Sequence, residues 1–140
     1  EVFKLLEATE VISSRAACER MSERDLAKLE RLICSMDDMQ DDPERWSLEN
    51  VRLHQFICER SGTHLAGEVM TKTLDQWNRI RRYYLDEVFA SRLARAQKQH
   101  WAILEALKLR DIDRVERVIQ QHNQTALADY QVLLSKVSQS

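Results

Sequence analysis

The 140-residue chain has the length of one ordinary domain, and 44% of its residues are hydrophobic and 31% charged. A formal net charge of -2 excludes a strongly basic, nucleic-acid-binding surface spread over the chain. Two Gly and one Pro are too few for a protein rich in tight turns, so the composition predicts an all-α fold. The sequence shows neither a run of roughly 20 apolar residues nor an opening signal-peptide pattern, so we expect no membrane association.

The first half of the chain predicts three amphipathic helices. The first covers residues 2 to about 20. Ser-Glu-Arg-Asp at residues 22–25 has the form of a capping box, and the apolar residues that follow recur at three- and four-residue steps as far as Met36. A third helix is predicted from about Glu44 to Arg60. The Ser-Gly-Thr segment at 61–63 then supplies a C-cap and a possible N-cap.

The second half predicts three more helices, from about Leu65 to Phe89, from about Leu93 to Leu109, and from about Arg114 to Lys136. Together these segments predict a single antiparallel bundle of about six or seven helices, spanning residues 1–140. The chain begins inside a helical pattern, at residues 1–6. We therefore expect an excised fragment that lacks an N-terminal domain.

The three cysteines, Cys18, Cys34 and Cys58, are far apart and form no Cys-x-x-Cys pair. Cys34 and Cys58 each follow an isoleucine within an apolar helical pattern. This arrangement favours buried free thiols in a reducing, cytoplasmic environment.

Three of the four histidines, His54, His100 and His122, lie on the predicted apolar faces of three different helices. Burial of three imidazoles without partners is costly, whereas a shared cation would satisfy all three rings. Asn50 lies one turn before His54 on the same face and could add an oxygen ligand. Such a donor set suits Zn²⁺ or Ni²⁺, with water or a ligand oxygen in the open positions. His64, off any apolar stripe, is interpreted as a surface or capping residue.

An anionic ligand beside such a metal would need a further cation. Arg81 shares the inward face of the fourth helix with Trp77, and its planar guanidinium suits carboxylate recognition. Trp77 and Tyr84 are candidate lining residues. A solvated or ion-paired arginine and plain core aromatic residues remain open as alternatives.

Several segments carry a resemblance to a known family. Residues 50–54, Asn-Val-Arg-Leu-His, resemble an Asp-x-x-Phe-His motif, and residues 100–111 resemble a His-x-x-Ile-Leu-x-Ala-Leu-x-x-x-Asp element. Both motifs, with His122 in the final helix, are similar to the FadR C-terminal (FCD) domain family of GntR-type bacterial transcription regulators. The resemblance covers essentially the whole chain.

This resemblance implies a dimeric, cytoplasmic helical bundle that follows a winged helix-turn-helix domain and reaches DNA only through it. It also implies a metal held by an Asp and three His, beneath a cavity that binds small carboxylates such as sugar acids or citrate-like molecules. Here Asn50 stands in place of the Asp, which removes a negative charge from the ligand set. Phe3 falls about where many members carry an arginine that binds the effector.

The leading interpretation is therefore an effector sensor rather than an enzyme. A metal-dependent enzyme with a His₃/Asn site remains an alternative, since such a metal can activate water. The sequence offers no convincing general base, because Glu49 points off the face of Asn50 and Glu105 lies five residues beyond His100. A metal-free helical interaction module is the third possibility.

Overall fold

The computed structural model describes residues 1–83 and 85–139, and these residues form six helices without a strand. The prediction of an all-α bundle is confirmed. The helices are α1 (Val2–Arg20), α2 (Glu23–Asp37), α3 (Pro43–Ser61), α4 (His64–Tyr83), α5 (Leu85–Lys108) and α6 (Ile112–Gln139).

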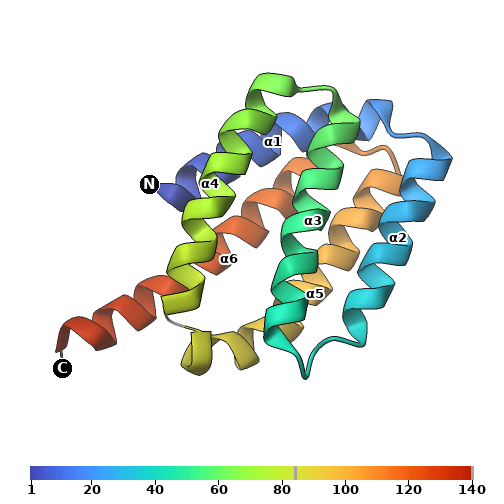
Figure 1. Ribbon diagram of the computed structural model, residues 1–140. Coiled ribbons are helices and arrows are strands. Elements are labelled where there is room, and N and C mark those ends of the chain that lie inside the picture. The colour runs from blue at the N-terminus through green and yellow to red at the C-terminus, as the bar shows by residue number, and fades with distance from the viewer. Residues whose placement is uncertain (84, 140) are drawn as a thin grey trace.

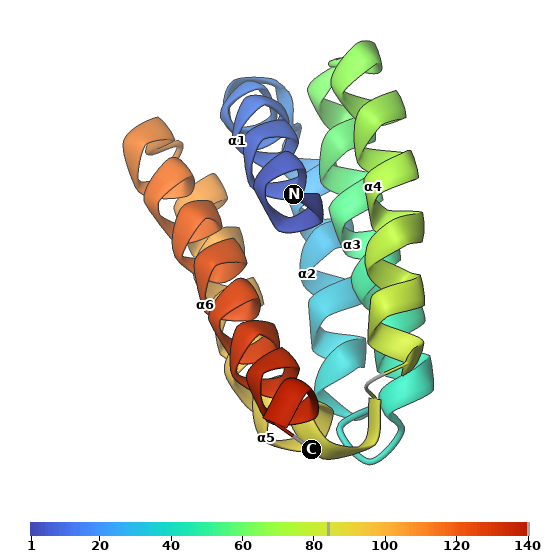
Figure 2. The ribbon, with the colours of Figure 1, turned by 90° about the vertical axis from the view of Figure 1, so that its left-hand side faces the viewer.

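Helix α1 runs through the middle of the bundle. Figure 2 shows α1 between α6 on one side and α4 on the other, and α1 also packs against α3. Helix α5 packs against α6 and α2, and the last turns of α6 extend away from the other helices (Figure 1). Four helices, α1, α3, α5 and α6, therefore approach one another in the interior, where they can place side chains in one site.

Local capping interactions set several helix ends. Ser22 and Asp25 form the predicted capping box: the Ser22 Oγ accepts a hydrogen bond from the Asp25 backbone N–H at 3.0 Å, and the Asp25 carboxylate accepts one from the Ser22 N–H at 3.1 Å. Asp42 caps α3 by accepting from the Arg45 N–H at 3.2 Å. Gly62 ends α3 with a φ of 74°, a left-handed conformation that glycine adopts without steric cost.

The boundary between α4 and α5 differs from the prediction. The sequence pattern predicted one helix from Leu65 to Phe89 and the next from Leu93, whereas α4 ends at Tyr83 and α5 begins at Leu85. The stretch from Arg79 to Arg92 contains neither Gly nor Pro. Local sequence therefore carries no stop signal there. The two helices pack against different neighbours, α4 against α1 and α3, and α5 mainly against α6 and α2.

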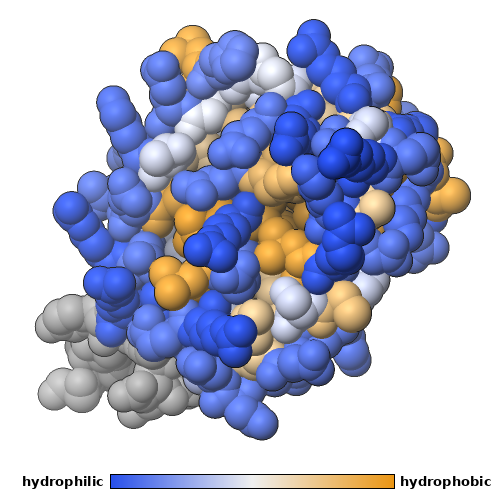
Figure 3. All heavy atoms as spheres, turned by 45° about the vertical axis from the view of Figure 1, so that its right-hand side comes forward, coloured by the Kyte–Doolittle hydropathy of each residue, from blue (hydrophilic) through white to orange (hydrophobic). Residues whose placement is uncertain are grey.

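The hydrophobic core forms two clusters. One joins α2, α3 and α5 through residues such as Leu29, Leu53 and Leu107, and the other joins α1, α4 and α6 through Phe3 and Trp77. On the face drawn in Figure 3, hydrophilic residues cover most of the surface, and apolar atoms are visible in a hollow near its centre. Within the described residues, no helix is both long enough and apolar enough to cross a membrane.

All three cysteines are free thiols, and Cys18 and Cys58 are buried, as predicted. The prediction of burial is wrong for Cys34, which is exposed. Cys34 follows the buried Ile33 by one residue, and one residue corresponds to about 100° of rotation around a helix. That rotation turns the thiol from the core to the surface.

Candidate metal centre

Three buried imidazoles from three helices meet in the interior of the bundle. His54 from α3, His100 from α5 and His122 from α6 each offer one ring nitrogen, and these nitrogens all lie within 4.8 Å of one another. The ring centroids are 5.0–5.7 Å apart. The structure thus brings together the three histidines that the sequence analysis selected.

Each imidazole uses its Nδ1 atom for a contact with a side chain outside the cluster. His54 Nδ1 lies 3.1 Å from the Glu10 carboxylate, and His100 Nδ1 lies 3.3 Å from Gln97 Oε1. His122 Nδ1 lies 2.7 Å from Gln99 Oε1. Because these oxygens are hydrogen-bond acceptors, a proton on each Nδ1 satisfies the contact and leaves Nε2 with a lone pair that can bind a cation.

The orientation of the Gln97 amide is fixed by its other partners. Its Nε2 donates to the backbone carbonyl of Ile33 and to the Asp37 carboxylate, both at 2.8 Å. The opposite end, Oε1, accepts from Trp46 Nε1 at 3.1 Å and faces His100. A reversed amide would point its donors at the indole N–H, so the network holds His100 in the Nδ1–H form.

Asn50 is the fourth candidate ligand. It lies one turn before His54 on α3, is buried, and lines the same cavity as His54 and His122. Among the described side chains, Asn50 Oδ1 and His100 Nε2 are buried polar atoms without a hydrogen-bond partner. Such atoms are rare in folded proteins, and one bound cation would satisfy both.

The spacing of the three rings suits a first-row divalent ion. Nitrogens that share an ion at about 2.1 Å lie at most about 4.2 Å apart. The observed limit of 4.8 Å is close to that value, so small side-chain movements would complete the coordination. The three imidazoles and the Asn50 oxygen therefore fit a Zn²⁺ or Ni²⁺ ion.

Burial also keeps the imidazoles in the form that binds metals. Burial lowers the pKa of His100 well below 6.5, and the charges of His54 and Arg92 lower it further. The pKa of His122 is lowered well below 6.5 by burial and then by His100 and His54, against which Glu10 acts in the opposite direction. Both rings are therefore neutral at pH 7.

Glu10 contributes a buried carboxylate to the edge of this centre. It is 4% exposed on α1, and its second oxygen accepts a hydrogen bond from Asn123 Nδ2 at 3.1 Å. Burial alone would raise the pKa of Glu10. The charge and hydrogen bond of His54, aided by His122 and Asn123, instead leave the pKa below its usual 4.5. The carboxylate is therefore ionised in the folded protein.

A small cavity of about 20 Å³ adjoins the histidines and opens toward the second core cluster. A volume of this size holds about one water molecule. Trp77 and Arg92 are among the lining residues. Arg92 is largely buried, lies 5.1 Å over the ring of Tyr130, and is 3.5 Å from Asp129. The Arg92 guanidinium and the candidate metal centre therefore border the same small cavity.

The other predicted effector residues have different surroundings. Arg81 is fully buried, donates to Asn78 Oδ1 at 3.0 and 2.8 Å, and lies 3.6 Å from Glu44. Its guanidinium is 5.9 Å from the centre of the Trp77 ring. Tyr84 lies outside the described residues.

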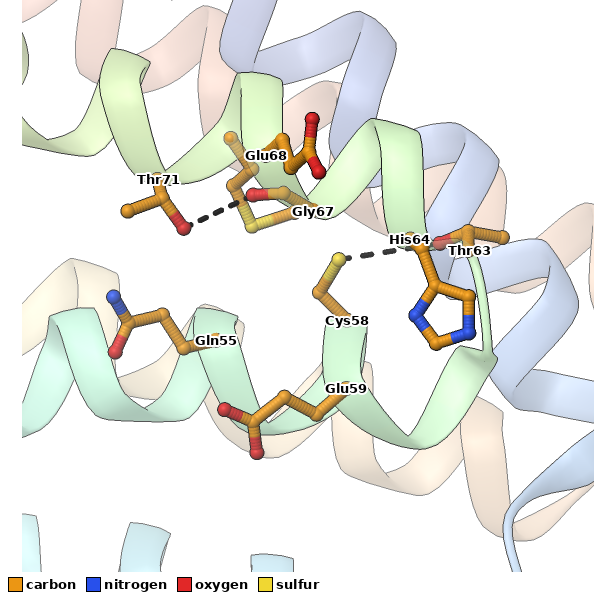
Figure 4. Close-up of a pocket in the computed structure, with 9 residues that line it drawn as sticks. Gln55, Cys58, Glu59, Thr63, His64, Gly67, Glu68 and Thr71 are labelled. Atoms are coloured by element: carbon orange, nitrogen blue, oxygen red, sulfur yellow. Dashed lines mark hydrogen bonds between the residues drawn. The ribbon is translucent and has the colours of Figure 1, made fainter.

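A larger groove of about 410 Å³ lies between α3 and α4, and none of the three clustered histidines lines it. Figure 4 shows Cys58 and Glu59 on α3 opposite Gly67, Glu68 and Thr71 on α4, with the imidazole of His64 at one end. His64 is exposed, which agrees with its interpretation as a surface residue. Among the described residues, the metal-type cluster is the His54–His100–His122 group.

Four residues of the site were not predicted from the sequence: Arg92, and the side chains that hold the histidines, Glu10, Gln97 and Gln99. One signal was available. Glu10 lies four residues after Leu6 and seven after Phe3, on the buried face of α1. A charged residue on that face indicates a buried partner.

The fold is thus an all-α bundle that encloses a histidine cluster, and an arginine lines the cavity beside it. The FCD domain family matches residues 1–125 of this chain. The chain belongs to the FCD domain family, the C-terminal domains of GntR-type transcription regulators, as the resemblance predicted.

Comparison with solved structures agrees with this fold. The chain is similar to E. coli McbR/YncC, with a TM-score of 0.85 and 21% sequence identity. The match covers 94% of this chain and 67% of that one. At this identity the likeness concerns the fold. No curated protein sequence matches the chain.

Proposed function

We propose that this chain is the metal-dependent, effector-sensing and dimerisation domain of a cytoplasmic GntR-type regulator. DNA binding would come from an N-terminal domain of the same protein. The observation that supports this proposal most strongly is the buried meeting of three imidazoles, each with Nδ1 engaged, beside the unsatisfied Asn50 oxygen.

In this proposal Asn50, His54, His100 and His122 hold one Zn²⁺ or Ni²⁺ ion. The bound ion supplies a Lewis-acidic anchor for a small carboxylate, such as a sugar acid or a citrate-like molecule. The protein's own contribution is to keep His100 and His122 neutral, to orient the three imidazoles through their Nδ1 contacts, and to exclude bulk water by burial.

Arg92 is the residue best placed to bind the effector carboxylate, because it lines the cavity that His54 and His122 also line. Trp77 forms another part of the cavity wall. The guanidinium of Arg81 lies over the Trp77 ring, so Arg81 contributes to effector binding by holding that ring in place. The 20 Å³ cavity is smaller than an organic acid, so binding requires the walls to separate. Such movement of α1, α4, α5 or α6 would favour one dimer arrangement over another, which is what regulation requires.

A sensor fits this site better than an enzyme does. Glu10 is the carboxylate nearest to the histidines, and a hydrolytic metal centre would need a free general base of that kind. Both Glu10 oxygens, however, already accept hydrogen bonds, one from His54 and the other from Asn123. The Glu10 carboxylate therefore stabilises the site and is not available as a free general base.

The proposal is tested by thermal melting of chelator-treated protein with Zn²⁺ or Ni²⁺, followed by a panel of sugar acids and di- and tricarboxylates. We expect the metal to raise Tm and some acids to raise it further only in the metal-loaded protein. Light scattering is expected to report a dimer. A Tm that responds to neither metal nor metal plus acid would contradict the sensor function, and turnover of an acid would favour the enzyme.

A further inference from the structure

We propose that Glu10 is the charge-balancing partner of the metal centre and also the residue that orients His54. This inference rests on the proposed metal site. It assigns a role in metal retention to a residue of α1, a helix that supplies none of the four proposed ligands.

Each oxygen of the Glu10 carboxylate contacts one buried side chain. Oε1 lies 3.1 Å from His54 Nδ1, and Oε2 accepts from Asn123 Nδ2 at 3.1 Å. Asn123 in turn donates to the carbonyl of Ile119 at 3.1 Å, which fixes its amide with the nitrogen toward Glu10. Both partners are donors, so the geometry requires an acceptor on each oxygen, as an ionised carboxylate provides.

The need for this charge follows from the ligand set. Neither Asn50 nor an imidazole ligand carries a negative charge, so a divalent ion would bring two uncompensated positive charges into a buried site. The guanidinium of Arg92 lines the same cavity and has Asp129 as its own counter-ion at 3.5 Å, so Asp129 does not balance the ion. Buried charge without a counter-ion is costly. Among the residues that line this cavity, Glu10 is the carboxylate, and it acts on the ion through the His54 ring.

The same contact orients the ligand. A carboxylate at Nδ1 holds the His54 ring in one position, places the proton on Nδ1, and makes Nε2 a stronger donor to a metal. Loss of such an outer contact typically lowers metal affinity by about 10–100-fold. Glu10 is thus a positioning residue rather than a ligand.

The test is a titration of chelator-treated protein with Ni²⁺ in competition with a chromophoric chelator. Glu10→Gln keeps the size of the side chain and removes its charge, and we expect it to lower Ni²⁺ affinity at least tenfold. The matched control is Glu19→Gln, which removes a charge from an exposed position of the same helix and should leave affinity unchanged. A melting curve of each variant without metal checks that it is folded.

A second variant separates charge from orientation. Adding Asn50→Asp to Glu10→Gln returns a negative charge to the centre but no carboxylate to His54 Nδ1, so the double variant should recover part of the lost Ni²⁺ affinity and stay weaker than the wild type. It also serves as the test if Glu10→Gln alone does not fold. Wild-type affinity in Glu10→Gln would overturn the assignment, and a folded double variant that binds Ni²⁺ no better than Glu10→Gln would overturn the charge-balancing role. Failure of the wild type to bind Ni²⁺ would instead overturn the metal site itself.

Discussion

Gln97 and His100 lie one turn apart on α5, and Gln97 Oε1 is 3.3 Å from His100 Nδ1. The same amide joins α5 to α2 through the Ile33 carbonyl and Asp37, and to α3 through Trp46. The indole of Trp46 also stacks on the His100 ring, with centroids 5.5 Å apart and planes within 12°. The ring of one proposed ligand is therefore held by three helices.

Replacement of Gln97 by Leu should weaken both folding and metal binding. The variant removes the acceptor for His100 and Trp46 and leaves the Ile33 carbonyl without this donor in a buried region, at a cost of about 1–3 kcal/mol. His100 also becomes free to move its proton to Nε2. We expect a lower urea midpoint and a Ni²⁺ affinity reduced about tenfold or more. Gln121→Leu, at an exposed position of α6, should change neither quantity, and equal effects in the two variants would disprove the role of Gln97.

The metal-free protein should lose stability in mild acid. The pKa values of His100 and His122 are lowered below 6.5 in the folded state, chiefly by burial, so the unfolded chain binds more protons as the pH falls below about 6.5. Their contribution to stability is full above that pH and declines below it. The lowered pKa of Glu10 adds a separate loss only below about 4.5.

Urea unfolding between pH 7.5 and pH 5.0 measures this dependence. We expect a constant unfolding free energy above about pH 6.5 and a steady decrease below it, with a smaller decrease in His122→Gln. A free energy that does not change between pH 7 and pH 5 would contradict the burial of neutral imidazoles.

Arg92 and Arg95 offer a matched pair for the effector site. Both contact Asp129, but Arg92 is buried and lines the cavity, whereas Arg95 is exposed. In Arg92→Gln, the apparent affinity for the carboxylate, measured by the rise in Tm, should fall at least tenfold. The metal should be retained. Asp129 keeps Arg95 as its partner in that variant, so the fold should persist. Loss of the response in Arg95→Gln but not in Arg92→Gln would place the effector elsewhere.

Much of the fold was predictable because it depends on local signals. The capping box at Ser22, the acidic break before Pro43 and the glycine at 62 set helix ends that the sequence identifies directly. The end of α4 at Tyr83 has no such signal, and the predicted helix end at Phe89 is wrong.

The buried face of α1 shows a different limit. The apolar residues Leu5 and Ile12 of α1 are 41% and 54% exposed. The buried face instead includes Thr9, Glu10 and Ser13. Apolar residues on more than one side of α1 make its buried face ambiguous from periodicity alone, although Phe3 and Leu6 share that face with Glu10. The three histidines were identifiable because each lies among apolar residues of its own helix.

Metal content is the most direct test of the central claim. Protein purified without chelator is analysed by native mass spectrometry and elemental analysis, as the wild type and as His100→Ala and His122→Ala. We predict one Zn²⁺ or Ni²⁺ per chain in the wild type and a strong loss in each variant, together with loss of the rise in Tm that metal produces. A wild type free of metal after incubation with both ions, or variants with unchanged metal content, would contradict the account.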